Sequence, residues 1–317
     1  MINFTRMFSA QIFFAGLLLV GSVQTNAASL SDTIDEFRRV MSEGKASTSV
    51  DIDNDSLLLK KDDGFYTSGM RLSYAVTVSD AKKSSTAGWR IGQEQYTASD
   101  IKLLPSQFGP PDHPYAAWLY GGVFKQTHLA DGTHVKLGVD LGCLGPCAGG
   151  EWTQNTLHRI IGQPLPQGWS KQVRNEFGVV LYADVAPVRW KPTAAVDVTP
   201  VLHARFGNIY TDAGIGATMR AGQLNSFPEQ DALYGYLRVD ARAVAYNASL
   251  QGGYFSSANP HVVKPKRLVG EAELGIEWRS APYAAQVALV RRGNEIDGLS
   301  NAIGAQNFAR LQFSYSP

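Results

Sequence analysis

The chain has 317 residues, of which 44% are hydrophobic and 18% are charged, and its formal net charge at pH 7 is +1. A chain with this balance lacks the excess of positive charge with which proteins bind nucleic acid, so no nucleic-acid partner is expected. Its mean hydropathy of −0.14 excludes a bundle of membrane-spanning helices, but it suits a membrane barrel whose interior face is polar.

Residues 1–27 are predicted to be a secretory signal peptide. Arg6 precedes an apolar run over residues 12–20, and small and polar residues follow as far as Ala27 and Ala28. The run is about half the ~20 residues that a spanning helix needs. We therefore expect export and cleavage near Ala27 or Ala28, rather than an inner-membrane anchor.

Residues 28–48 form a separate N-terminal segment that we expect to lie in the periplasm. Apolar residues recur in it at helical spacing, which predicts a short amphipathic helix over residues 30–48. These apolar residues are Ile34, Phe37, Val40 and Met41.

Residues 49–317 show the period of two that is typical of β-strands. In residues 237–243, for example, Leu, Val and Ala alternate with Arg and Asp, so one face is apolar and the other is charged. Strands of ten or more residues with a charged inner face favour a transmembrane β-barrel over a soluble sandwich, and the inner charges are expected to pack the lumen as ion pairs. Twelve strands are predicted, at residues 49–58, 66–78, 87–97, 115–128, 133–143, 174–187, 194–208, 210–222, 232–250, 266–279, 281–293 and 303–316.

The predicted connections alternate between short and long. Residues 130–132 and 280–281 form tight turns, whereas residues 98–114, 144–173 and 251–265 are long. Single-chain bacterial barrels have an even number of antiparallel strands, short periplasmic turns and long extracellular loops. The sequence therefore predicts an all-β, antiparallel transmembrane barrel of about 12 strands whose long loops lie outside the cell.

The two cysteines of the chain, Cys143 and Cys147, are separated by a Gly-Pro turn. In an exported protein this spacing favours a small disulfide. A metal or redox pair is the alternative, but the chain has no further cysteine and no histidine next to these two.

Chemically unusual residues gather in five segments, which the strand directions bring to the outer rim of the first half of the barrel. The last of the five is predicted to be a short helix in a long extracellular loop. Because the segments are far apart in sequence, their convergence favours a functional site. The segments are residues 54–56, 64–69, 92–97, 112–115 and 151–162.

The first predicted strand carries three carboxylates and an amide near its outer end. Asp51, Asp53 and Asp55 share one strand face, and Asn54 interrupts the apolar face on the other side. Clustered hard oxygens suit Ca²⁺, which takes six to eight oxygen ligands. A solvated rim without a metal is the alternative interpretation of these residues.

The predicted loop helix carries a second polar pair. Gln154 and His158 are four residues apart and therefore share one helix face. A neutral imidazole at this position could take a proton from a water molecule. A purely structural histidine is the alternative.

Seven pieces of the sequence resemble the outer-membrane lipid A 3′-O-deacylase family, and the resemblance is dense over residues 50–178. The run over residues 154–162 is the most specific of them. The pieces are Asn54-Asp55, Tyr66-Thr67-Ser68-Gly69, Gly92-Gln93 with Tyr96, Asp112-His113-Pro114-Tyr115-Ala116, Leu141-Gly142 with Gly145-Pro146, residues 154–162, and Gly168-Trp169 with Gln172.

The resemblance implies a twelve-stranded barrel with a calcium-dependent esterase site between the wall and a loop helix. His158 would be the general base, with Gln154 beside it on the helix face, and Thr67 would line the site. Water, or conceivably Ser68, would attack an acyl chain of lipid A.

The resemblance also implies that Asn54 and Asp55 hold the Ca²⁺, which would polarise the ester carbonyl. One position departs from the family pattern, because Pro164 stands where an acidic residue can join the metal site. The site would then have to recruit Asp53, Glu151 or backbone oxygens, or the metal would be weakly held or absent.

The function expected from the sequence is Ca²⁺-dependent hydrolysis of an ester-linked 3′ acyl chain of lipid A, in the outer membrane of a Gram-negative bacterium and on its outer side. The expected partners are lipopolysaccharide and the lipid of that membrane; the oligomeric state stays open. Two alternatives are a non-enzymatic barrel, either structural or a narrow channel, and a phospholipase with the same chemistry.

Overall fold

The computed structural model describes residues 30–58, 64–107 and 111–317. The signal peptide predicted at residues 1–27 lies outside the described residues. The α-helices are α2 (Leu30–Glu43), α3 (Gly150–Ile161), α4 (Ala248–Gln251) and α5 (Asn301–Gly304). The strands are β1 (Lys45–Asn54), β2 (Phe65–Ser79), β3 (Lys83–Thr97), β4 (Ala116–Leu129), β5 (His134–Leu144), β6 (Glu176–Ala186), β7 (Trp190–Thr193), β8 (Val196–Gly207), β9 (Tyr210–Gln223), β10 (Ala232–Asn247), β11 (Leu268–Ser280), β12 (Tyr283–Arg292) and β13 (Gln306–Tyr315).

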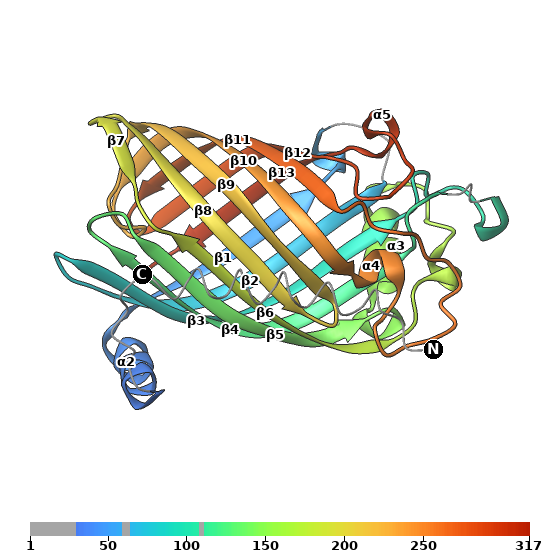
Figure 1. Ribbon diagram of the computed structural model, residues 1–317, viewed down its shortest axis with the longest axis horizontal. Helices are drawn as coiled ribbons and strands as arrows, with labels where there is room; N and C mark the ends of the chain where they lie inside the picture. The colour runs from blue at the N-terminus through green and yellow to red at the C-terminus, as the bar shows by residue number, and fades with distance from the viewer. Residues whose placement is uncertain (1–29, 59–63, 108–110) are drawn as a thin grey trace, which may run out of the picture.

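The strands form one antiparallel sheet that closes into a barrel (Figure 1). Apart from β6 and β7, neighbours in sequence are neighbours in the sheet, and two further pairings close the ring: β1 with β13, and β6 with β8. The short β7 pairs with β8 alone and forms a side hairpin. The predicted antiparallel barrel of about 12 strands is therefore confirmed, with β7 as an extra strand that the alternation did not predict.

Side chains alternate between a lipid-type outer face and a charged interior. On β2, Met70 and Leu72 are exposed on the outer face, and Ile91 of β3 and Val123 of β4 continue this apolar belt. A closed barrel satisfies all of its backbone hydrogen bonds between strands, so an apolar belt can face hydrocarbon without unpaired peptide groups.

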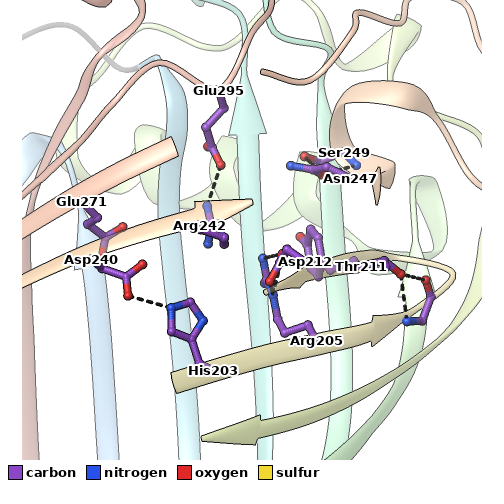
Figure 2. A network of polar contacts seen from close by, with 12 residues as sticks. His203, Arg205, Thr211, Asp212, Asp240, Arg242, Asn247, Ser249, Glu271 and Glu295 are labelled. Atoms are coloured by element: carbon purple, nitrogen blue, oxygen red, sulfur yellow. Dashed lines mark hydrogen bonds and ion pairs between the residues drawn. The ribbon is translucent and has the colours of Figure 1, made fainter. Parts of the chain in front are cut away.

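Ion pairs fill the interior, as the sequence predicts. Figure 2 shows part of this network, in which His203 contacts Asp240 at 2.6 Å and Arg242 contacts Glu295 at 3.0 Å. Further pairs inside the barrel join Arg90 with Asp140, Arg205 with Asp212, Arg220 with Asp197, Arg292 with Glu271 and Arg310 with Asp53.

The two ends of the barrel differ. One, here called the loop end, carries α3, α4 and α5 and long connections that include residues 98–107, 111–115, 145–175 and 248–267 (Figure 1). The other, the turn end, carries α2, the C-terminus and short connections such as residues 80–82. This asymmetry confirms the predicted alternation of short and long connections.

The N-terminal helix is shorter than the sequence predicts. The expected helix over residues 30–48 ends at Glu43, because residues 45–48 pair with β2 and belong to β1. β1 correspondingly ends at Asn54, four residues earlier than the predicted strand, and residues 56–58 form a 3₁₀ turn. None of the described helices is both long and apolar enough to cross a membrane.

Candidate active site

Helix α3 follows β5 through a tight, cross-linked turn and packs against the outer face of the barrel wall. Cys143 and Cys147 form the predicted disulfide, with their Cα atoms 6.0 Å apart. The helix starts so close to the wall that a Cβ on Gly150 would lie 2.4 Å from the Cβ of Ala117 on β4. Only glycine allows this approach, and it sets the helix against the wall.

Two glutamines of β3 hold the start of the helix. Gln93 donates from Nε2 to the carbonyl oxygen of Ala148 at 2.6 Å. Gln95 donates to Oε1 of Gln93 at 2.8 Å and to the carbonyl oxygen of Gly150 at 3.5 Å. These amides satisfy backbone groups at the junction between wall and helix, so α3 is fixed rather than loosely attached.

A cavity of about 20 Å³ lies between the wall and the helix. That space is sufficient for about one water molecule. The cavity brings together all five residues that the sequence predicts to be catalytic. Its lining residues are Asn54, Ser56, Thr67, Ser68, Gln95, Gln154, Leu157, His158, Ile161 and Gln163.

The wall side of the cavity is formed where β1 ends and β2 begins. Oδ1 of Asn54 accepts hydrogen bonds from the backbone N–H of Ser56, at 2.8 Å, and from its hydroxyl, so the amide is held at the strand end. Thr67 is the extra residue of a bulge in the pairing of β2 with β3, and its hydroxyl lies 2.7 Å from that of Thr97. Bulges re-aim side chains, which explains how Thr67 and the next residue, Ser68, both line the cavity.

The helix side of the cavity presents an oriented imidazole. His158 is 4% exposed, and its Nδ1 lies 2.6 Å from the carbonyl oxygen of Pro164. A carbonyl oxygen only accepts, so Nδ1 carries the proton and Nε2 is the acceptor nitrogen of the neutral ring. Pro164 therefore contributes to the site through its backbone carbonyl.

The amide of Gln154 is oriented by an indole. Trp169 donates from Nε1 to Oε1 of Gln154 at 2.9 Å, and both side chains are 2% exposed. Because an indole N–H can only donate, the amide oxygen must face Trp169. Nε2 is then a buried donor, and it makes no hydrogen bond within the described part of the chain.

The predicted metal ligands are only partly brought together. Asn54 lines the cavity, and the neighbouring Asp55 is buried and accepts a hydrogen bond from the backbone N–H of Gly64 at 3.1 Å. Asp53 does not reach the cavity, because it points into the barrel and pairs with Arg310 at 2.8 Å. No cluster of three or more His, Cys, Asp or Glu side chains suited to a metal occurs among the described residues.

The oxygen atoms beside the cavity show whether Ca²⁺ could bind there. The available ligands are hard oxygens: the amide of Asn54, the hydroxyl of Thr67 and the adjacent carboxylate of Asp55. This chemistry suits Ca²⁺ rather than a soft transition metal. Three protein ligands are fewer than the six to eight that Ca²⁺ takes, so water or substrate oxygens would complete the shell, and we expect weak binding.

One predicted segment of the rim lies outside the cavity. Asp112 accepts hydrogen bonds from the backbone N–H and the hydroxyl of Ser99, at 2.8 and 3.0 Å, and so ties the long connection after β3 to itself. His113 is buried and stacks on Tyr96 at 5.1 Å, and burial lowers the pKa of its imidazole. These residues shape the loop end and are not among those that line the cavity.

The fold and the site define a class of protein: a membrane-spanning antiparallel β-barrel with a histidine-containing cavity between its wall and a loop helix. The chain belongs to the family described as outer membrane protein LpxR, whose model matches residues 12–316. It is accordingly a multi-pass β-barrel of the outer membrane of a Gram-negative bacterium.

Solved structures show the same fold. LpxR from Salmonella typhimurium is 23% identical, with a TM-score of 0.72 over 85% of this chain and 99% of that one. The β domain of the Bordetella autotransporter BrkA is 10% identical, with a TM-score of 0.50 over 86% of this chain and 98% of that one. No curated protein sequence matches the chain.

Proposed function

We propose that the protein is a lipid A deacylase that hydrolyses an ester-linked acyl chain, at the 3′ position, from the outer face of the outer membrane. One observation carries the proposal: an imidazole of fixed tautomer borders a cavity the size of one water molecule, beside polar residues from two strands and a loop helix. Membership of the LpxR family supports it.

His158 acts as the general base. Its Nδ1–H is held by the carbonyl oxygen of Pro164, so Nε2 takes a proton from the attacking water as the water oxygen forms a bond to the ester carbonyl carbon. The same proton then passes to the leaving alkoxide of the sugar. Water is the nucleophile in this proposal because the cavity holds about one water molecule beside the base.

Gln154 stabilises the negative charge that develops on the carbonyl oxygen. Its Nε2 is a buried donor on a side chain whose orientation Trp169 fixes. A donor that is already oriented loses little free energy to reorganisation during the reaction, and one such donor typically contributes about 10²–10³-fold in kcat. Asn54 and Asp55 would hold Ca²⁺, which when bound would supply Lewis-acid polarisation of the same carbonyl.

The mouth of the cavity suits an acyl chain. Leu157 and Ile161 line the cavity and are also exposed, and Ile160 and Trp152 on the same helix are 76% and 73% exposed. Large apolar side chains on a helix that packs on a membrane barrel are expected to contact lipid. An ester bond in the cavity would lie beside His158, while the acyl chain of the substrate would stay among these apolar side chains. This requires the loop end to face the cell exterior.

The proposal is tested with purified protein and lipid A in detergent micelles containing Ca²⁺. The expected product is lipid A that has lost one ester-linked acyl chain, together with the free fatty acid, both detected by mass spectrometry. The variant His158→Ala should keep the heat-modifiable mobility of a folded barrel while losing the activity. If the protein releases fatty acid from phospholipid but not from lipid A, it is a phospholipase and not a lipid A deacylase.

A further inference from the structure

Helix α2 docks on the outside of the barrel wall, not on its mouth. Val40 is buried against Val76 of β2 and Ala87 of β3. These two positions share the strand faces of Leu72 and Ile91, which belong to the apolar belt that faces lipid. Figure 1 shows α2 beside the outer wall at the turn end.

The helix crosses the strands rather than following them. Its last turn leads into β1, and a Cβ on Gly44 would lie 2.4 Å from Val76, so the chain touches β2 there. One turn earlier Val40 reaches β3, and a further turn earlier Glu36 reaches Lys125 of β4. Figure 1 shows α2 running across the long axis of the barrel. A helix in this direction lies parallel to the plane of a membrane that the barrel spans.

Glu36 joins the helix to the wall by charge. Its carboxylate pairs with Lys83 and Lys125, and the hydroxyl of Ser85 donates to it at 3.1 Å. Burial would raise the pKa of Glu36, but the hydrogen bonds from Lys125 and Lys83 outweigh it and lower the pKa to about 2. The helix thus supplies the counter-charge for two lysines on the lipid-facing side of the wall.

The sides of α2 that do not touch the wall differ in character: one carries apolar residues and another carries charged residues. Residues four apart share a line along a helix, and each successive residue is rotated by about 100°. With Glu36 and Val40 on the wall, Phe37 and Met41 form a line on one side; both are 38% exposed. Residues 35 and 39 form the line on the opposite side.

The two sides of the helix differ in chemistry. Asp35 and Arg39 are charged and exposed, and Asp35 accepts a hydrogen bond from Arg38 at 2.8 Å. Phe37 and Met41, on the opposite side, are large apolar side chains beside a wall whose outer face is also apolar. Of the two sides, the one with Phe37 and Met41 is therefore suited to hydrocarbon.

We propose that α2 is an interfacial membrane helix: Phe37 and Met41 enter the lipid of the leaflet around the turn end, and residues 35, 38 and 39 stay in the headgroup region or in water. With the orientation proposed above, this is the phospholipid leaflet. We identify lipid as the partner of Phe37 and Met41 because the barrel wall next to them already faces hydrocarbon.

The test places an environment-sensitive fluorophore on the full chain in phospholipid nanodiscs, attached to cysteines introduced singly. The native cysteines are joined as a disulfide and do not compete for the label. The substitutions Phe37→Cys and Met41→Cys report on the apolar line, and Arg39→Cys is the matched control two residues away.

The expected result is a blue-shifted emission at positions 37 and 41, strong quenching by lipids with a spin label on the acyl chain, and loss of quenching by aqueous iodide. Position 39 should show the reverse pattern. Equal iodide quenching at positions 37 and 39 would overturn the proposal, as would lipid quenching that is strongest at position 39. The two apolar positions are separate readouts, so misfolding of one variant leaves the other decisive.

Discussion

Replacing Trp169 by phenylalanine removes the hydrogen bond that orients the proposed oxyanion donor and keeps the aromatic ring. The indole N–H lies 2.9 Å from Oε1 of Gln154, and both side chains are buried. Without it, Oε1 is left without its donor, at a cost of about 1–3 kcal/mol. Turning the amide around does not remove this cost, because Nε2 would then face the phenyl ring without an acceptor. Neither orientation is strongly favoured, and in the turned one the cavity meets an acceptor instead of a donor.

The loss for Trp169→Phe is limited by the value of one oriented donor, about 2.7–4 kcal/mol in transition-state stabilisation. An amide that is turned around part of the time lowers kcat only in proportion to the time for which the donor is lost, so we expect kcat to fall about twofold to tenfold with little change in KM. The readout is the initial rate of fatty-acid release from lipid A over a range of substrate concentrations.

Two further variants sharpen this test. Trp190→Phe changes an exposed tryptophan of β7, at the other end of the barrel, and should leave kcat unchanged. Gln154→Glu can still accept from Trp169 but carries no amide donor, so it should lose activity as fully as Gln154→Ala. Unaltered kcat in Trp169→Phe, or activity retained by Gln154→Glu, would show that the amide of Gln154 is not the oxyanion donor.

The remaining predictions concern the nucleophile, the metal and the N-terminal helix. Ser68→Ala should retain most of the deacylase activity, because water is the proposed nucleophile; loss of activity with normal folding would assign that role to Ser68. Chelation should suppress activity, and about millimolar Ca²⁺ should be needed to restore it, because the site offers few carboxylates; in Asp55→Asn, added Ca²⁺ should restore little. The folded pKa of Glu36, about 2, lies below its ordinary value of 4.5, so its contribution to docking α2 is complete above about pH 4.5 and is lost as pH falls toward 2. A label at position 37 should therefore move from lipid to water over that acidic range and stay in lipid from pH 5 to 8. In Glu36→Gln, docking should be weakened from pH 5 to 8 and should no longer change with pH over the acidic range.

Most of the barrel could be predicted from the sequence, because the alternation of side chains is a direct consequence of a wall with lipid on one side and charge on the other. The exception is β7, Trp190–Thr193, whose four residues are all exposed and carry no alternation. The end of the N-terminal helix was also missed. Helical spacing does not reveal that residues 45–48 gain a backbone partner in β2.

The candidate site could be predicted where it depends on residue type and local spacing. Gln154 and His158 share a helix face by their spacing, and the strand directions brought them to Asn54. The same parity separates Asp53 from Asn54, since adjacent strand residues point to opposite faces; Asp53 consequently lies inside the barrel with Arg310.

The groups that orient His158 and Gln154 could not be predicted from the sequence. The carbonyl of Pro164 orients His158 through a backbone atom, and every residue type has such an atom. Trp169 belongs to a quoted motif, but its hydrogen bond spans 15 residues and depends on how the loop folds. The outward amides of Gln93 and Gln95, which interrupt an apolar face, were the available signal for the junction between wall and helix.

The most direct test of the central claim is a mass spectrum of lipid A from isogenic Gram-negative cells that express either the protein or its His158→Ala variant, at equal levels of folded barrel. If His158 is the general base of a lipid A deacylase, the first cells contain a lipid A species that lacks one ester-linked acyl chain, and the second contain intact lipid A. Intact lipid A in both, or the deacylated species in both, would contradict this assignment.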